Sequence, residues 1–162
     1  MVTWCLNKAK LEIEKGQLHR GLINKKPDQK LALEHIKKAE HNLEVFLYNK
    51  ERGYYDWTIN IGFYVIYHCF LAILVKYGYE SKNQECTLAA IESLVEDKKL
   101  DPDFNIYVQA IKTTNKKEEE QIMPMREKYQ YTPIIEIDVQ KVEELLKLCQ
   151  DIIKDAKGII EG

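Results

Sequence analysis

The sequence predicts an all-α protein, an up-and-down antiparallel bundle of four to five helices in one domain spanning residues 1–162. Its length is that of a single domain. Seven glycines and four prolines are too few for the many tight turns of an all-β chain. Apolar residues recur every three or four positions in several segments, and the connections between these segments are short, which favours antiparallel neighbours.

The first two expected helices differ in the strength of their periodicity. Apolar spacing is weak over residues 2–13, and Gly16 interrupts it soon afterwards. It is clear over residues 32–47, where the helix should begin near Pro27, because proline is favoured in a first helical turn. Gly53 ends this helical region or opens the next.

The third expected helix, residues 54–77, is apolar on nearly every side. A helix without a polar face is buried, so this one should be central in the bundle. Its most apolar stretch, residues 61–75, is shorter than the ~20 residues that span a bilayer and contains Gly62. We therefore expect a core helix and no membrane segment, with Gly78 as its C-terminal glycine.

The C-terminal half shows three further features. Residues 88–95 predict a shorter helix, and the Asp101-Pro102 pair is a helix start signal. Residues 113–133 lose periodicity and carry two prolines, which predicts a loop or a frayed helix end. Residues 142–160 form the cleanest amphipathic stripe, with Asp138 well placed as the N-cap of that helix.

The charge balance limits the classes of partner. The net charge is −2, from 24 basic and 26 acidic groups, whereas proteins that bind duplex nucleic acids usually carry a positive excess. A local patch can still bind RNA. Bidentate phosphate contacts need the guanidinium fork, which the chain offers at three positions: Arg20, Arg52 and Arg126.

The cysteines and histidines form no recognisable metal or cofactor motif. His35 and His41 are six residues apart and would lie on different faces of a helix, so we expect no metal and no cofactor. No secretory signal is visible, which predicts a cytoplasmic protein. In a reducing cytosol the well-separated cysteines are expected to be small buried apolar side chains: Cys5, Cys69, Cys86 and Cys149.

Four motifs occur in a characteristic order along the chain. Residues 36–44 contain an Ala-Glu-x-x-Leu pattern. Residues 62–74 hold an aromatic pair, an aromatic-His dipeptide and an apolar run ending in Ile-Leu. A turn follows at residues 75–79. The last motif covers residues 81–88, with Gln84 at a position where relatives often carry His. This order resembles the HEPN family (higher eukaryotes and prokaryotes nucleotide-binding) over about residues 30–160.

The resemblance implies a four- or five-helix bundle that is commonly dimeric. Many relatives are encoded beside a minimal nucleotidyltransferase in toxin–antitoxin pairs. Their active toxins are metal-independent ribonucleases with an R-x(4–6)-H motif. Here Arg126 is followed after four residues by Tyr131 and not by His. An imidazole has an ordinary pKa near 6.5 and a phenol one near 10, so the family's usual proton acceptor is missing.

The resemblance implies a nucleotide- or RNA-binding site around Arg126, with Lys128, Tyr129 and Tyr131 beside it. Arg126 would contact a phosphate and is also the one candidate catalytic residue. The alternative interpretation is that Arg126 is a surface arginine or forms an ion pair within the bundle. The two tyrosines can stack on bases, or they can cover an edge of the core. Both alternatives stay open at this stage.

The expected central helix carries more large aromatic residues than a bundle of this size needs. Tyrosine and tryptophan are enriched in interfaces, so we expect homodimerisation through Tyr64, Tyr67, His68 and Leu71. For His68 the alternative is a core histidine that bonds to a neighbouring helix.

Two functions follow from these observations. The first is an interaction module that binds nucleotide or RNA. Its expected partners are a second copy of the chain and a nucleotidyltransferase in a toxin–antitoxin-like pair. The second is a metal-independent, toxin-like ribonuclease that uses Arg126 with a nonstandard partner residue. The histidine missing after Arg126 favours the first.

Overall fold

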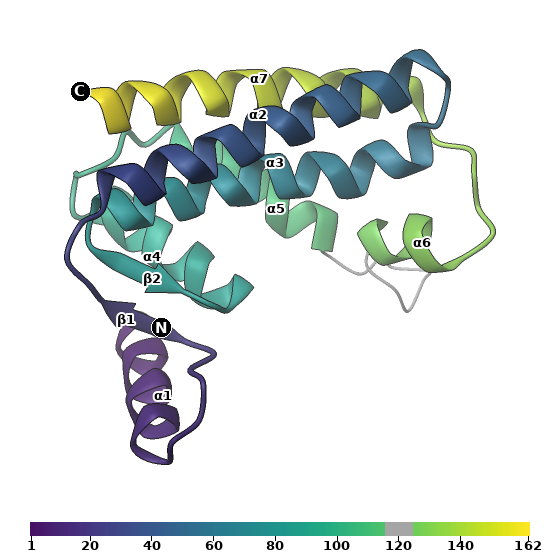
Figure 1. Ribbon diagram of the computed structural model, residues 1–162. Coiled ribbons are helices and arrows are strands. Elements are labelled where there is room, and N and C mark those ends of the chain that lie inside the picture. Colours follow the sequence, from purple (N-terminus) through teal and green to yellow (C-terminus); the bar gives the residue numbers. More distant parts are fainter. Residues whose placement is uncertain (116–124) are drawn as a thin grey trace.

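The computed structural model describes residues 1–115 and 125–162 (Figure 1). The described part is predominantly helical, which confirms the predicted all-α class. Its elements are α1 (Val2–Glu14), β1 (Leu22–Asn24), α2 (Gln29–Glu51), α3 (Tyr55–Lys76), β2 (Tyr79–Ser81), α4 (Gln84–Glu96), α5 (Phe104–Asn115), α6 (Met125–Tyr131) and α7 (Val139–Glu161).

Three long helices, α2, α3 and α7, lie side by side and form the main layer of the bundle (Figure 1). Helices α4, α5 and α6 pack against the other side of α3. Side-chain caps fix where α2 and α7 begin. Asp28 accepts a bond from the Leu31 amide at 3.0 Å, and Asp138 accepts one from the Gln140 amide at 2.9 Å. The predicted N-cap at Asp138 is thereby confirmed.

Helix α3 is the core helix, because twelve of its 22 residues are buried. It is long and apolar enough to cross a membrane by length and composition, yet 72% of its most apolar window is buried inside the bundle, as in the core helix of a soluble protein. One side of α3 is left open in the single chain. Trp57 and Tyr64 keep 49% and 41% of their surface exposed along one side of the helix.

Gly62 allows α7 to approach α3 closely. A Cβ atom at this position would lie 2.6 Å from Cδ2 of Leu145, and the Cys149 thiol donates to the Gly62 carbonyl oxygen at 3.6 Å. Any side chain here would force the Leu145 side chain, or α7 with it, to shift. The predicted turn at Gly78 is confirmed by its φ of +85°, a left-handed conformation that favours glycine.

A short antiparallel ribbon joins the N-terminal segment to the bundle. Strands β1 and β2 pair with Leu22 opposite Ser81 and Asn24 opposite Tyr79. The sequence did not predict these strands. Helix α1 packs on this ribbon and on α4, and it projects away from the three long helices (Figure 1).

The expectation of four reduced cysteines is wrong for two of them. Cys5 of α1 and Cys86 of α4 form a disulfide with a Cα–Cα distance of 5.8 Å. Cys69 and Cys149 are free and buried, and burial raises the pKa of both thiols. Because one pair is oxidised, the cysteines no longer support the expectation of a reducing compartment.

The region predicted as a loop or frayed helix end is partly regular helix. Helix α5 continues to Asn115, and α6 forms a separate helix of seven residues. Arg126 therefore lies on a helix and not in a loop. The charged run Lys-Lys-Glu-Glu-Glu at residues 116–120, within the predicted loop, lies outside the described residues.

Candidate functional site

Helix α6 holds Arg126 against the central helix. The guanidinium carbon of Arg126 lies over the Phe63 ring, 4.5 Å from its centroid. A cation over an aromatic face is attracted by the electron-rich ring. The helix ends where the Thr132 hydroxyl donates to the Lys128 carbonyl oxygen, one residue before Pro133. The sequence therefore places a partly buried arginine at a defined position on α3.

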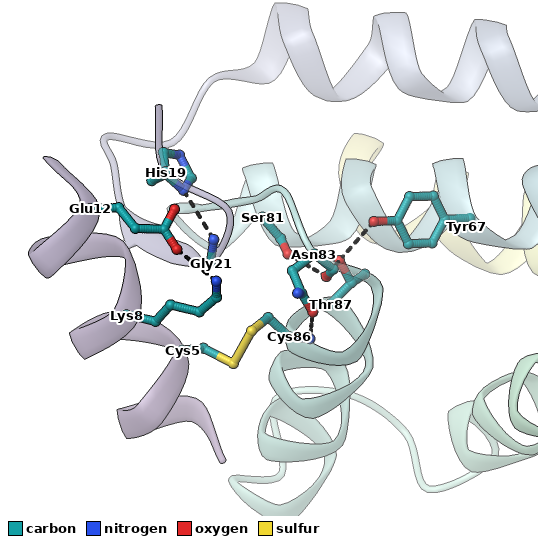
Figure 2. The surroundings of a disulfide bond; sticks show 10 residues. All are labelled: Cys5, Lys8, Glu12, His19, Gly21, Tyr67, Ser81, Asn83, Cys86 and Thr87. Atoms are coloured by element: carbon teal, nitrogen blue, oxygen red, sulfur yellow. Dashed lines mark hydrogen bonds and ion pairs between the residues drawn. A yellow bond between two sulfur atoms is a disulfide. The ribbon is translucent and has the colours of Figure 1, made fainter. Parts of the chain in front are cut away.

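An aromatic column continues from this arginine into the bundle. The Tyr67 ring stacks on Phe63 at 5.8 Å with an interplanar angle of 11°, and Tyr64 meets Phe63 edge-on at 5.2 Å. The Tyr67 hydroxyl lies 3.2 Å from the Thr87 hydroxyl, within hydrogen-bond distance (Figure 2). Burial raises the pKa of Tyr67, so this phenol stays protonated and is a poor general base at neutral pH.

The other residues predicted around Arg126 differ in exposure. Tyr129 is only 9% exposed and belongs to the core, which favours its alternative as a core-edge residue. The Lys128 ammonium lies 5.5 Å from the Tyr129 ring centroid. Tyr131, at the end of the same helix, is 69% exposed. Helix α6 thus presents one exposed aromatic ring together with two basic side chains.

The residues predicted at a dimer interface fall into two groups. Tyr64, His68 and Leu71 recur at spacings of four and three, and all three are partly or largely exposed on the open side of α3, in line with Trp57. Tyr67 instead points toward α4, where it bonds to Thr87 (Figure 2). The structure therefore brings three of the four predicted residues together on one surface.

A shallow pocket of about 330 Å³ opens between α2 and α3 beside this surface. It is lined by Lys38, Asn42, Val45, Ile61, Tyr64 and His68. At its edge the Nδ1 atoms of His35 and His68 are 3.1 Å apart. In a neutral pair one Nδ1–H donates and the other nitrogen accepts.

The environment keeps these two imidazoles neutral. Burial lowers the pKa of His68 to about 4, with smaller contributions from His35 and the Lys38 ammonium. Burial also lowers the pKa of His35, against a smaller opposing effect of Glu34. His68 therefore fits the alternative of a histidine bonded to a neighbouring helix. The sequence reading compared His35 with His41, because it considered spacing along one helix only.

The side chains of α6 are suited to binding a phosphate and a base. Arginine offers five N–H donors in a planar fork that matches phosphate oxygens, and an exposed tyrosine can stack on a base. Helix α6 contains no histidine. Within residues 1–115 and 125–162, no group of three or more His, Cys, Asp or Glu side chains is arranged to hold a metal ion.

Comparison with known proteins gives one assignment. The family model described as the HEPN domain matches residues 32–159, which is most of the chain. No curated protein matches the sequence. HEPN domains are generally soluble, commonly dimerise, and bind nucleotide or RNA. The match runs from the first turn of α2 to the last turn of α7 and includes both Phe63 and Arg126. With most of its length matched and a helical bundle as its fold, this chain belongs to the HEPN domain family.

Proposed function

We propose that this protein is a homodimeric module that binds single-stranded RNA or a nucleotide through α6. The observation that carries this proposal is the position of Arg126 over the Phe63 ring. A contact with an aromatic face restricts the long arginine side chain, so less conformational entropy is lost when the guanidinium meets a phosphate. Tyr131 then offers an exposed ring to a neighbouring base.

Binding is favoured over cleavage by the groups around Arg126. Metal-independent cleavage of RNA needs a group that accepts the 2′-hydroxyl proton near neutral pH. Tyr131 stands where active relatives carry histidine, and Tyr67 in the adjacent column has a raised pKa. Two basic side chains and an exposed ring can hold an RNA strand without such a group.

The dimer is proposed from the symmetry of the open side of α3. Trp57 and Leu71 lie seven residues on either side of Tyr64, and all three are at least partly exposed. In an antiparallel pair of α3 helices centred on Tyr64, Trp57 of one copy would meet Leu71 of the other. Such a self-complementary contact is the kind that closes a twofold dimer.

Sedimentation tests the dimer. We expect a species of twice the 19.1 kDa chain mass at micromolar concentration, and Tyr64→Arg should shift it to monomer by placing a charge in the apolar face. Ile106→Arg, on the exposed side of α5, is the control that should leave the dimer intact. A wild-type protein that sediments only as a monomer contradicts the proposal.

The proposal also includes a minimal nucleotidyltransferase as a protein partner in a toxin–antitoxin-like pair. Its support is the family membership and not a surface of the bundle. Affinity purification of the tagged chain from its native cells, followed by mass spectrometry, should recover that enzyme in a stoichiometric amount. Recovery of the chain with no nucleotidyltransferase would remove this part of the proposal.

Fluorescence anisotropy with labelled single-stranded RNA tests the site on α6. Arg126→Ala should weaken binding about tenfold or more, as expected for loss of a charge-assisted phosphate contact. Arg20→Ala is the matched control, because it removes an arginine from the N-terminal segment. Equal affinity of wild type and Arg126→Ala refutes the site. Cleavage of the RNA in EDTA that disappears in Arg126→Ala would establish the ribonuclease instead.

A further inference from the structure

The segment of residues 1–24, called here the N-terminal unit, precedes the part of the chain matched by the family. Its strand β1 pairs with β2, and His19 Nε2 lies 2.7 Å from Glu80 Oε1. Lys25, just after the unit, bonds to the other oxygen of Glu80 at 2.5 Å. The second half of the unit is thus attached to the bundle by several polar contacts.

Helix α1, the first half of this unit, has little apolar burial to hold it. Only three of its thirteen residues are buried, and none has a large apolar side chain. Val2 and Leu6 are partly buried and pack against the core. Three other large apolar side chains face solvent, with Trp4 52%, Leu11 55% and Ile13 51% exposed. Since hydrophobic stabilisation scales with the apolar area removed from water, burial contributes little to the docking of α1. An isolated helix of this length is also marginal in water.

The Cys5–Cys86 disulfide links α1 covalently to α4 and adds to this limited packing. Both cysteines are fully buried between α1 and α4, and Figure 2 shows the bond crossing directly between these helices. The backbone of α1 packs closely against the segment that precedes β1. A Cβ atom on Gly21 would lie 2.5 Å from the Cys5 carbonyl oxygen, so the α1 backbone rests directly on the chain before β1.

The two cysteines are not equivalent as leaving groups. Cys86 lies in the first turn of α4, where its amide donates to the Asn83 side chain at 3.0 Å. The N-terminus of a helix stabilises a thiolate. Cys5 sits on the helix that has weak packing and can open. A thiolate that attacks the Cys5 sulfur would therefore release Cys86 as the favoured thiolate.

We propose that Cys5–Cys86 is a reversible thiol–disulfide exchange site that docks α1 when oxidised and releases it when reduced. The reactant is a dithiol reductant. Its first thiolate forms a mixed disulfide with Cys5 and displaces Cys86, and its second thiol closes a cyclic disulfide and frees Cys5. Two electrons and two protons pass to the protein, which gains two thiols. The β1–β2 ribbon and the bundle keep their structure in both states.

Differential alkylation of the native protein tests the exchange. After incubation with dithiothreitol, Cys5 and Cys86 should react with iodoacetamide, while Cys69 and Cys149 stay protected by the core. In a second sample, removal of the dithiothreitol and incubation with oxidised glutathione before the iodoacetamide step should restore protection of the first pair. If Cys5 and Cys86 stay thiols after oxidation, or stay linked after reduction, the proposal is wrong.

Limited trypsin digestion tests the release. Reduction should speed cleavage at Lys8, Lys10 and Lys15 about tenfold or more, whereas cleavage at Lys154 on α7 should not change. Cys5→Ser should show the fast N-terminal cleavage in both redox states, and Cys69→Ala should respond like wild type. Unchanged N-terminal cleavage on reduction contradicts release, and a parallel rise at Lys154 would mean that the whole bundle opens.

Discussion

The bundle and the N-terminal unit are held by different forces. In α3 twelve of 22 residues are buried, and Phe63 and Phe70 are almost fully enclosed. In α1 three of thirteen are buried, and a covalent bond replaces the missing apolar contacts. The comparison teaches that two helices of one chain can be held in place by different kinds of interaction. The bundle depends on the apolar area removed from water, whereas α1 combines limited packing with a covalent bond whose presence depends on redox conditions.

The largest expected effect is the loss of stability when a buried apolar side chain of the bundle is truncated. Phe70→Ala should lower the free energy of unfolding by about 4 kcal/mol, because it removes a fully buried ring and leaves a cavity. Leu11→Ala, the same kind of truncation on α1, should change it by less than about 0.5 kcal/mol, because Leu11 is more than half exposed. Urea unfolding followed by circular dichroism measures both. Similar losses in the two variants would contradict the difference described.

A second effect concerns the contact between α3 and α7. Gly62→Ala should cost about 2 kcal/mol, because the added methyl group would overlap the Leu145 side chain. The matched control is Gly158→Ala on α7, where no atom lies within 4 Å of the added Cβ. It should stabilise the helix by about 0.5–1 kcal/mol in the same urea experiment. A stabilised Gly62→Ala variant would show that the two helices separate easily.

The smallest effect is a pH dependence confined to the bundle. The pKa of His68 is about 4 in the folded protein and near 6.5 in an unfolded chain. The unfolded state therefore takes up the proton first, and stability should fall as the pH drops from about 6.5 to about 4. With a discount for the half-buried ring, we expect a loss of about 1 kcal/mol between pH 7 and pH 5.

Replacement of the histidine identifies the source of this loss. His68→Gln should flatten the dependence of unfolding free energy on pH over that range. The control is His41→Gln, on the exposed side of α2, which should leave the dependence as in wild type. Charge near the pair comes from Glu34 and Lys38 of α2, so these residues are kept unchanged in both variants. A wild-type protein equally stable at pH 7 and pH 5 would contradict the lowered pKa.

The same comparison explains how much of the fold could be predicted from the sequence. The bundle was predictable because burial imposes a period of three to four on apolar residues, and local signals such as Asp138 and Gly78 mark helix ends. The strands of the ribbon have three residues each, too few for a period of two to be detected. The disulfide joins residues separated by 81 positions and has no local motif.

The candidate site was predicted only in part, because its contacts join segments that are far apart in the sequence. Family likeness pointed to Arg126, but its contact with Phe63 joins segments far apart in the sequence. Helix α6 has only seven residues and packs against α3 and α5, so tertiary contacts and not its own periodicity decide its structure. The His35–His68 pair likewise bridges two helices, and spacing along one helix could not reveal it.

The chain contains two tryptophans, and the fold gives one to each region: Trp4 to α1 and Trp57 to the open side of α3. Both indoles are about half exposed, so each should change its emission when its surroundings change. A Trp57→Phe variant would leave a fluorophore that reports the docking of α1. A Trp4→Phe variant would leave one that reports association through α3. The protein thus carries a separate optical probe for each of the two proposed events, without any attached label.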